Sequence, residues 1–247
     1  MEKVMFNGGQ RHIYQPGEPI EKYERVPFDK AEVITTEAAL EFHPKFADPE
    51  KIIFSDVTEF IPDVNAKMMD WWLANMEKGY HAWAPGEHYG FDWIVPPCEV
   101  GYEGSVERAY EFDLEHPIVI TRQSITKYPF TECYEHCWMG ATHLGPADTL
   151  LIHMYQDVEG GMYWRSIVVT SKEGVDFVIA HQDEIPLASH MQYESGRLKD
   201  FLPPLYRLWK DVPDPWENVQ YDLTTVRQPD GTWKHKYDNK PHKNVNL

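Results

Sequence analysis

The stretch DTLLIHMYQDVEGGMYWRSIVVTS, residues 148–171, combines two strand-forming runs with a turn between them. Residues 148–156 and 162–171 are rich in β-branched and aromatic side chains, as strands are. The intervening DVEGG suits a hairpin turn, because glycine adopts the positive φ angles that such turns need. The sequence therefore predicts an antiparallel β-hairpin at this place.

Further elements are predicted on both sides of this hairpin. Residues 105–112 (SVERAYEF) and 118–126 (IVITRQSIT) have strand character, with a turn around DLEHP between them. Residues 175–181 (VDFVIAH) form another short apolar run and are predicted as a strand. A helix is predicted over about 187–202, and Pro203-Pro204 ends, kinks or restarts it before LYRLWK.

Earlier in the chain the pattern is first helical and then irregular. In residues 63–78, DVNAKMMDWWLANMEK, apolar side chains recur at helical spacing, with Asp63 placed to cap the helix and Gly79 to end it. Residues 80–101 hold three prolines and three glycines without a steady period, which predicts a long loop. Long loops in compact domains are often functional.

This order of elements predicts an α+β fold in which a curved antiparallel sheet grips a C-terminal helix and leaves a cavity between them. Residues 49–211 are assigned to this helix-grip domain. Residues 1–48 are rich in Pro, Glu and turn formers, and an irregular, wrapping N-terminal segment is expected there. Residues 212–247 are polar, and a loose or surface-draped tail is expected.

The bulk composition narrows the classes of partner. The formal net charge of -17 disfavours nucleic acid and anionic membrane surfaces. No apolar run approaches the roughly 20 residues of a membrane span. Three cysteines do not suggest a disulfide framework and the N-terminus lacks an apolar signal core, so a cytoplasmic protein is expected. Aromatic residues make up 14% of the chain, and these can line a pocket for a flat ligand as well as a core.

Two residues on the predicted C-terminal helix can share one ion. His190 and Glu194 are four apart in SHMQYESGRLKDFLPPLY, so they project from one face of the helix a turn apart. Imidazole and carboxylate together suit zinc or another first-row divalent metal. An isolated pair of this kind is more often a solvated helix face with a weak His–Glu contact, so the spacing alone is not specific.

Further candidate ligands lie in the predicted loop and on a strand. His88, in YHAWAPGEHYGFDW, stands among aromatic residues in a Gly/Pro-rich loop. Glu107 and Glu111 are four apart on a predicted strand and face the same side, where a buried carboxylate would need a cation. Taken singly, each of these residues fits a packing or surface role better.

Two more histidines, His143 and His153 in ATHLGPADTLLIH, are candidate acid–base or substrate-binding groups, with structural roles as the alternative. The run CYEHC at residues 133–137 lacks the spacing and the second half-site of a zinc knuckle. The chain contains no GxSxG, P-loop, GxGxxG or HExxH motif, which removes the common hydrolase, nucleotidase, dinucleotide-binding and zincin interpretations.

Taken in order, three segments between residues 63 and 209 resemble the diacetylphloroglucinol hydrolase and phloretin hydrolase family. HMQYE at 190–194, followed by FLPPLY, resembles the C-terminal helix signature of that family. HMYQDVEGGMYWRS at 153–166 resembles its H…D-x-x-G-G…R-S strand pair. MMDWWLANMEKGYHAWAPGEH, which ends at His88, resembles its helix and metal loop.

The resemblance implies a helix-grip, Bet v 1/START-like fold and one zinc ion per chain, held by two histidines and two glutamates. Carried over by position, the ligands are His88, His190 and Glu194. The fourth is a strand glutamate, for which Glu111 is preferred and Glu107 is the alternative.

The resemblance also implies roles for residues around the metal. Tyr80 matches a tyrosine that contacts the phenolic oxygens of the substrate, and His143 and His153 match two pocket histidines. Phe91 stands where the family has a polar amide that contacts substrate, which departs from the family pattern. Trp83, Trp93 and Phe91 are expected to exclude water if they line the cavity.

The activity implied is metal-dependent hydrolysis of the C–C bond between a phenolic ring and an acyl group, which releases a carboxylic acid. The substrate expected is a small aromatic ketone, acylphloroglucinol-like or phloretin-like. One rival is a metal-dependent cyclase or isomerase of aromatic polyketide metabolism, which Phe91 favours. Another is a non-enzymatic carrier of an aromatic or lipid ligand. A homodimer is left open, as is whether residues 1–48 cover the pocket or build its interface.

Overall fold

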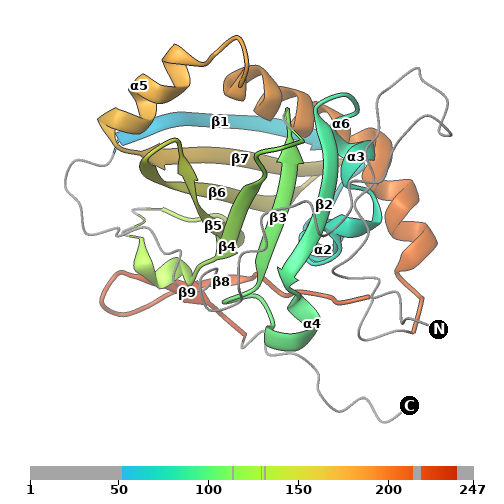
Figure 1. The fold of residues 1–247 in the computed structure, drawn as a ribbon. Helices are drawn as coiled ribbons and strands as arrows, with labels where there is room; N and C mark the ends of the chain where they lie inside the picture. Colours follow the sequence, from blue (N-terminus) through green and yellow to red (C-terminus); the bar gives the residue numbers. More distant parts are fainter. Residues whose placement is uncertain (1–51, 113, 129, 131, 214–217, 238–247) are drawn as a thin grey trace, which may run out of the picture.

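A seven-stranded antiparallel sheet is the framework of the computed structural model, which describes residues 52–112, 114–128, 130, 132–213 and 218–237 (Figure 1). The strand order is β1-β7-β6-β5-β4-β3-β2, so β2 to β7 form a meander. The first strand, β1, pairs with β7 and forms the edge opposite β2. The strands are β1 (Ile52–Pro62), β2 (His88–Val95), β3 (Val106–Glu111), β4 (Ile118–Arg122), β5 (His136–Leu144), β6 (Ala147–Val158) and β7 (Gly161–Thr170).

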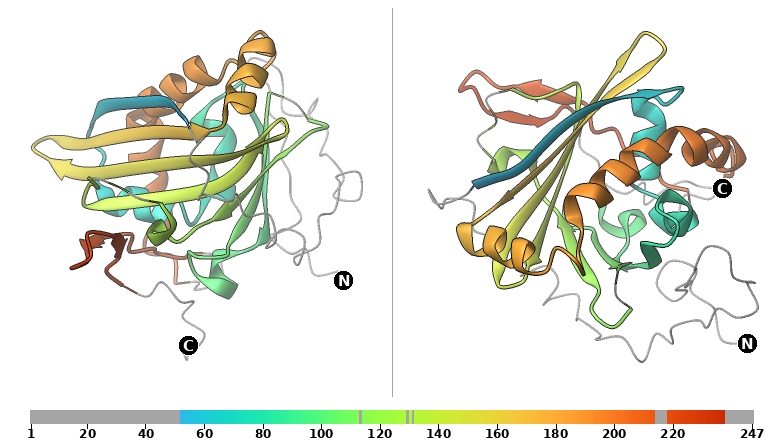
Figure 2. Two further views of the ribbon diagram at one scale, coloured as in Figure 1. Left: turned by 90° about the vertical axis from the view of Figure 1, so that its left-hand side faces the viewer. Right: turned by 90° about the horizontal axis from the view of Figure 1, so that it is seen from above.

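Helices cover one face of this sheet. The long helix α6 (Leu187–Trp209) contacts β1 and the short helices α2 (Ala66–Trp72) and α3 (Tyr80–Trp83). Seen from above, these helices lie on one side of the sheet and the small hairpin of β8 (Thr225–Arg227) and β9 (Trp233–His235) lies on the other (Figure 2). The predicted α+β, helix-grip arrangement is thereby confirmed.

Strand alternation divides the core between the two faces of the sheet. On β5, Trp138 belongs to the large cluster under the helices, whereas its neighbours Cys137 and Met139 belong to a second cluster on the opposite face. Trp233 of the small hairpin packs against that second cluster. Successive side chains of a strand point to opposite faces, so the register of each pair fixes which residues look toward α6.

The predicted hairpin is present, and β6 and β7 pair from Leu150↔Val169 to Val158↔Gly161. Gly160 has a φ of 80°, the left-handed conformation that the turn requires. The strand predicted over 105–112 is present as β3, and the one predicted over 118–126 is present as β4 but ends at Arg122, with a 3-10 turn, η4 (Ile125–Lys127), after it. Three strands that the sequence did not indicate, β1, β2 and β5, complete the sheet.

The predicted helix over 63–78 is wrong in its bounds. Asp63 has a φ of 62° in the turn after β1, and the side chain of Asn65 caps α2 by accepting a hydrogen bond from the Met68 amide at 3.0 Å. The helix ends early because the buried Asn75 side chain donates to the carbonyls of Trp71 and Val219. Such side-chain bonds compete with the helical pattern. A 3-10 turn, η3 (Met76–Lys78), follows.

Two other predictions of local structure are also wrong. Residues 175–181 are not a strand: they lie largely in the helix α5 (Lys172–Ala180), whose N-cap Ser171 accepts from the Gly174 amide. A short apolar run does not by itself distinguish a strand from a helix. Residues 80–101 are not one loop, since they hold α3, β2 and the short helix α4 (Pro97–Val100).

The last helix is longer than expected and passes through Pro203 and Pro204 to Trp209. Leu202 and Tyr206 on either side are buried, so tertiary packing holds the helical path where proline removes backbone hydrogen bonds. In the segment expected to be a polar tail, Tyr221 and Leu223 are buried in the main core. No described helix is long and apolar enough to cross a membrane. The irregular segment expected over residues 1–48 lies outside the described residues.

Candidate metal centre

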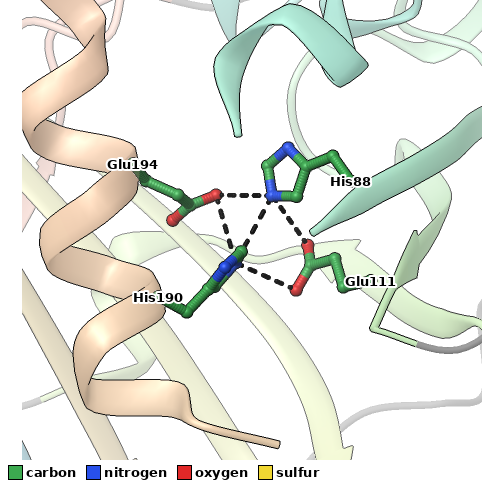
Figure 3. Close-up of side chains that lie close together, drawn as sticks. All are labelled: His88, Glu111, His190 and Glu194. Carbon is green, nitrogen blue, oxygen red and sulfur yellow. Dashed lines mark hydrogen bonds and ion pairs between the residues drawn. The ribbon is translucent and has the colours of Figure 1, made fainter. Parts of the chain in front are cut away.

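Four side chains from three separate elements point at one place between the sheet and α6 (Figure 3). They are His88 at the start of β2, Glu111 at the end of β3, and His190 and Glu194 on α6. The Nε2 atom of His88 lies 3.0 Å from Oε1 of Glu194 and 3.3 Å from Nε2 of His190. The Nε2 atom of His190 lies 3.4 Å from Oε2 of Glu111 and 3.6 Å from Oε1 of Glu194.

These separations match the edges of a metal tetrahedron. Zinc binds imidazole nitrogen and carboxylate oxygen at about 2.0–2.1 Å, which places tetrahedral donors about 3.3 Å apart. The five separations that involve a histidine range from 3.0 Å to 3.8 Å, and one atom from each of the four residues lies within 4.8 Å of the others. Two histidines and two carboxylates within this span form a donor set that suits zinc and similar divalent ions.

The orientation of the two imidazoles also requires a cation or a proton between them. The Nδ1 atom of His88 lies 3.0 Å from the Tyr80 carbonyl, and Nδ1 of His190 lies 2.6 Å from a carboxylate oxygen of Glu87. A carbonyl and a carboxylate only accept, so each Nδ1 carries the donated proton. Two rings without a proton on Nε2 would face each other with their lone pairs at 3.3 Å, which is repulsive unless something positive lies between them.

Local structure explains how the four donors meet. His88 and Glu111 are register partners in the β2–β3 pair, so the two strands deliver them to the same face. His190 and Glu194 are one helical turn apart on α6, as their spacing predicted. The indole N–H of Trp83 donates to the Glu194 carbonyl at 2.9 Å and fastens α3 to this turn of α6.

Glu111, not Glu107, is the strand glutamate in this group. Glu107 lies on the same face of β3 but is ion-paired with Arg122 of β4, at 2.6 Å between Oε2 and Nη2. Both side chains of that pair are buried, and the Arg122 guanidinium lies over the rings of Trp93 and Trp138. The strand position alone could not distinguish the two glutamates, because four residues on a strand return to the same face.

Tyr80 contacts two of the four donors. Its ring stacks on His88, with centroids 3.9 Å apart and planes at 3°, and its hydroxyl donates to the Glu111 carboxylate. Burial and the charges of Glu111 and Glu194 raise the pKa of the Tyr80 phenol well above its usual range. The hydroxyl therefore stays protonated at neutral pH.

The carboxylates of the site strongly favour a positive charge between them. Burial lowers the pKa of His190, but Glu194, Glu111 and Glu87 outweigh burial and raise it to about 10. Burial raises the pKa of Glu111, whereas His190, His88 and the Tyr80 hydroxyl lower it to about 2. A metal-free site thus retains a proton that a divalent cation would replace, and the residues present fit such an ion.

A cavity adjoins the centre and is lined by three of its donors, Glu111, His190 and Glu194, but not by His88. The volume of this cavity is about 60 Å³. One water molecule needs about 10–15 Å³, so the cavity has room for several groups of that size. Besides the donors, its wall consists of aromatic and aliphatic side chains with two further polar residues: Leu73, Met76, Tyr80, Trp83, Glu107, Ile120, Trp138, Leu151, His153, Ile167, Leu187 and Met191. Most of the wall is apolar, as in pockets for small organic ligands.

Of the two candidate pocket histidines, His153 lines this cavity and His143 does not. His153 is stacked between Trp138 and Trp164, and its Nδ1 atom lies 3.0 Å from Oγ of Ser166. Burial and the charge of Arg122 lower its pKa to about 3, so the ring is neutral. His143 is paired with Asp148 at 3.2 Å and lines a second cavity, which also touches Glu111.

Strand parity explains the separation of the two histidines. His153 is the register partner of Trp138, which faces the helices, whereas His143 is five residues beyond Trp138 on the same strand. An odd number of residues along a strand reverses the side-chain direction. The prediction that both histidines share the pocket therefore holds only for His153.

The expected water-excluding aromatics are also divided. Trp83 lines the cavity, but Phe91 and Trp93 are not among its lining residues. Phe91 packs against Tyr80, and the Arg122 guanidinium lies over the Trp93 ring.

Glu87, Arg122 and Trp138 were missed by the sequence reasoning. For Glu87 a signal existed, because it immediately precedes His88.

A second group of possible ligands consists of Asp70, His136 and Asp222. Asp70 is already bound to its surroundings: it lies 3.1 Å from Nδ1 of His136 and accepts a hydrogen bond from the Tyr155 hydroxyl at 2.6 Å. The group therefore has the contacts of a structural ion pair that joins α2 to β5. No group of described residues within metal-binding distance includes a cysteine of the CYEHC run.

No protein-family model and no curated protein sequence matches the chain. Solved structures similar to it include a protein from Rhodobacter sphaeroides, with 18% identity, 63% of this chain and 99% of that chain covered, and a TM-score of 0.42. Norcoclaurine synthase from Thalictrum flavum is 13% identical, with coverages of 63% and 91% and a TM-score of 0.38. Major latex-like protein 151 from Panax ginseng is 13% identical, with coverages of 57% and 96% and a TM-score of 0.34. Likeness at this level says nothing about the site.

Proposed function

We propose that this protein is a zinc-dependent hydrolase that cleaves the C–C bond between a phenolic ring and its acyl group. The observation that carries the proposal is the convergence of His88, Glu111, His190 and Glu194 on one place, beside a largely apolar cavity that the last three of them line. Two carboxylates that are only 12% exposed are costly without a cation, and the cavity beside them would give a substrate access to that cation. The sequence resemblance supplies the reaction class.

The proposed reaction adds water across one bond. The acyl carbon gains the water oxygen and becomes a carboxylic acid, while the ring carbon that loses the acyl group gains a proton. A hydroxyl ortho or para to that carbon lets the ring accept the proton as its keto tautomer, which avoids a free aryl carbanion. A divalent ion in the centre would supply Lewis acidity toward the carbonyl oxygen or activate the water.

The residues of the chain then have separate tasks. The four donors would hold the ion. The Tyr80 hydroxyl lines the cavity, and its one proton, donated to Glu111 here, can turn to a substrate oxygen beside it. The neutral His153 ring, held by Ser166 and two tryptophans, can exchange a hydrogen bond with a phenolic oxygen. Trp83, Trp138 and the aliphatic wall limit water around the reacting atoms, which strengthens electrostatic contacts there.

Metal analysis and a substrate panel test the proposal together. The purified protein should contain about one zinc ion per chain and release a carboxylic acid from at least one acylphenol. The expected product pair is the deacylated phenol and the acid in equal amounts, quantified by chromatography. A protein that binds zinc but releases no acid from monoacyl- and diacylphloroglucinols or phloretin would overturn the assigned reaction while leaving the metal centre intact.

The apolar cavity wall favours a second candidate, a carrier for an aromatic ligand. Leu73, Ile120, Leu151 and Met191 would suit such a ligand without any chemistry. A carrier would contain no stoichiometric zinc, and a metal chelator would leave its affinity for an aromatic ligand unchanged. Binding of a fluorescent aromatic probe to the wild type, with and without the chelator, separates the two candidates.

A further inference from the structure

Glu87 occupies a distinct position beside the metal centre, in contact with a ligand but not among the four donors. One of its carboxylate oxygens lies 2.6 Å from Nδ1 of His190, on the side of the ring that faces away from the centre. His190 itself is almost fully buried, whereas the Glu87 side chain is 30% exposed. The contact therefore joins a buried ligand to a carboxylate at the edge of the site.

The backbone around Glu87 is well anchored. Its amide donates to the Ala84 carbonyl at 3.0 Å, and its carbonyl accepts from the Phe112 amide at 2.9 Å. The preceding Gly86 has a φ of 90°, which permits the tight turn that delivers Glu87 and His88 into β2. Because Phe112 directly follows Glu111, this turn is tied to the strand that carries another ligand.

The two imidazoles of the centre are held by different kinds of acceptor. His88 donates from Nδ1 to a neutral backbone carbonyl, that of Tyr80, and no substitution of the Tyr80 side chain removes this acceptor. His190 donates to a charged side chain from another element. The other contacts of its side chain are those of Nε2 with the other three donors at 3.3–3.6 Å, and edge contacts of the ring with Phe112 at 4.6 Å and with His88 at 5.0 Å. Among the described contacts, the Glu87 carboxylate is thus the acceptor that keeps a proton on Nδ1 of His190.

We propose that Glu87 is a positioning residue of the metal centre: it fixes the tautomer and ring plane of His190 and thereby sets the affinity for the ion. The inference rests on the proposed metal site but not on the reaction assigned to it. A metal-ligating histidine commonly donates its second N–H to a carboxylate, which orients the ring and makes it a stronger donor. Here the dipeptide Glu87-His88 supplies one ligand and the orienting group of another, so one turn couples β2 to α6.

The test measures metal affinity rather than activity. Zinc affinity is determined by competition with a chromophoric chelator for wild type, E87A and E87Q, and the Co2+-loaded proteins are compared by visible absorption. E87A should bind zinc about 10–100-fold more weakly than wild type, with an altered Co2+ spectrum. E87Q should lose much less, because its amide oxygen still accepts the Nδ1 proton. E159Q, at an exposed site in the β6–β7 turn, is the matched control and should bind as wild type does.

The outcomes separate this inference from the proposed function. An E87A protein with a native circular dichroism spectrum, wild-type zinc affinity and an unchanged Co2+ spectrum overturns the positioning role while the metal centre stands. E87Q as weak as E87A would assign the effect to charge and overturn positioning through the hydrogen bond. A wild-type protein without zinc affinity overturns both the metal centre and the role of Glu87.

Discussion

His88 and Glu194 are in contact, 3.0 Å apart between Nε2 and Oε1, although one begins the edge strand β2 and the other lies within α6. This contact joins the sheet to the helix that it grips. An ion bound between the two residues would use the same atoms as ligands and would fasten the same elements. Metal binding and the stability of the fold are therefore expected to be linked.

The first prediction concerns this linkage. Zinc at about 100 times its dissociation constant should stabilise the wild-type protein by about 2.7 kcal/mol, because the ion binds the folded state. Thermal unfolding with and without zinc measures the effect, after removal of bound metal by a chelator. His190→Ala should abolish the response. A melting temperature that zinc does not change in either protein would contradict the assignment of the centre.

The second prediction separates the two pocket histidines. His153→Gln should lower kcat by about 10²-fold or more if the ring manages a proton or a phenolic oxygen. His143→Gln should leave kcat within about threefold, because His143 does not line the cavity shared by Tyr80 and His153 and is paired with Asp148. Steady-state kinetics on an acylphenol substrate of the wild type is the measurement. An equal loss in both variants would show that the cavity geometry does not define the reacting site.

The third prediction concerns the hydroxyl of Tyr80. Tyr80→Phe retains the ring that stacks on His88 and the backbone carbonyl that holds it, and removes only the O–H that donates to Glu111. Zinc should still bind, with an affinity reduced by about tenfold or less, whereas kcat should fall by about 10²-fold or more. A variant with full activity would exclude Tyr80 from contact with the reacting oxygen atoms.

The fourth prediction concerns the ion pair of Glu107 and Arg122. Arg122→Met leaves a buried carboxylate without its partner and should destabilise the fold by about 3–5 kcal/mol. The double variant with Glu107→Gln should recover part of that loss, since no uncompensated charge remains. Urea unfolding of the single and double variants gives the two free energies. Additive losses would mean that the pair contributes nothing beyond the separate side chains.

The fifth prediction is a pH dependence at the ion pair of Asp70 and His136. Burial lowers the pKa of His136, but the bond to Asp70 outweighs it and raises the pKa above its usual 6.5. A raised folded-state pKa means that the pair stabilises fully below about pH 6.5 and that this contribution is lost as pH rises through the folded-state pKa. The destabilisation by His136→Gln should therefore be larger at pH 6 than at pH 9, by about 1–3 kcal/mol. Equal destabilisation at both values would refute a charged His136.

The hairpin of β6 and β7 and the helix pair His190–Glu194 were predictable because both depend on residues close in sequence. Turn chemistry at Gly160 and the 3.6-residue helical period act locally. The fourth ligand was open for the opposite reason. Glu107 and Glu111 lie on the same face of β3. They differ in the side chain that each contacts, which is Arg122 for Glu107 and His190 for Glu111.

The errors in local structure have a similar origin. Residues 175–181 are apolar enough for a strand, but the capping bond of Ser171 and packing against Leu144 and Val168 make them a helix. The helix expected over 63–78 stops where Asn75 bonds to Val219, more than a hundred residues away. His143 was expected in the pocket, and the parity of β5 turns it away.

By itself the sequence determined the α+β class, the β6–β7 hairpin, the C-terminal helix and three of the four donors of the candidate centre. Periodicity, turn residues and short motifs carry this information, because each depends only on residues close together in the chain. Only the tertiary structure showed that Glu111, not Glu107, lies with the other three candidate donors, that His143 lines a separate cavity, and that Glu87 contacts His190. These depend on strand register and on contacts between elements far apart in the chain. His88 and Glu194 are in contact across the site, and their separation in the sequence carries no information about this distance.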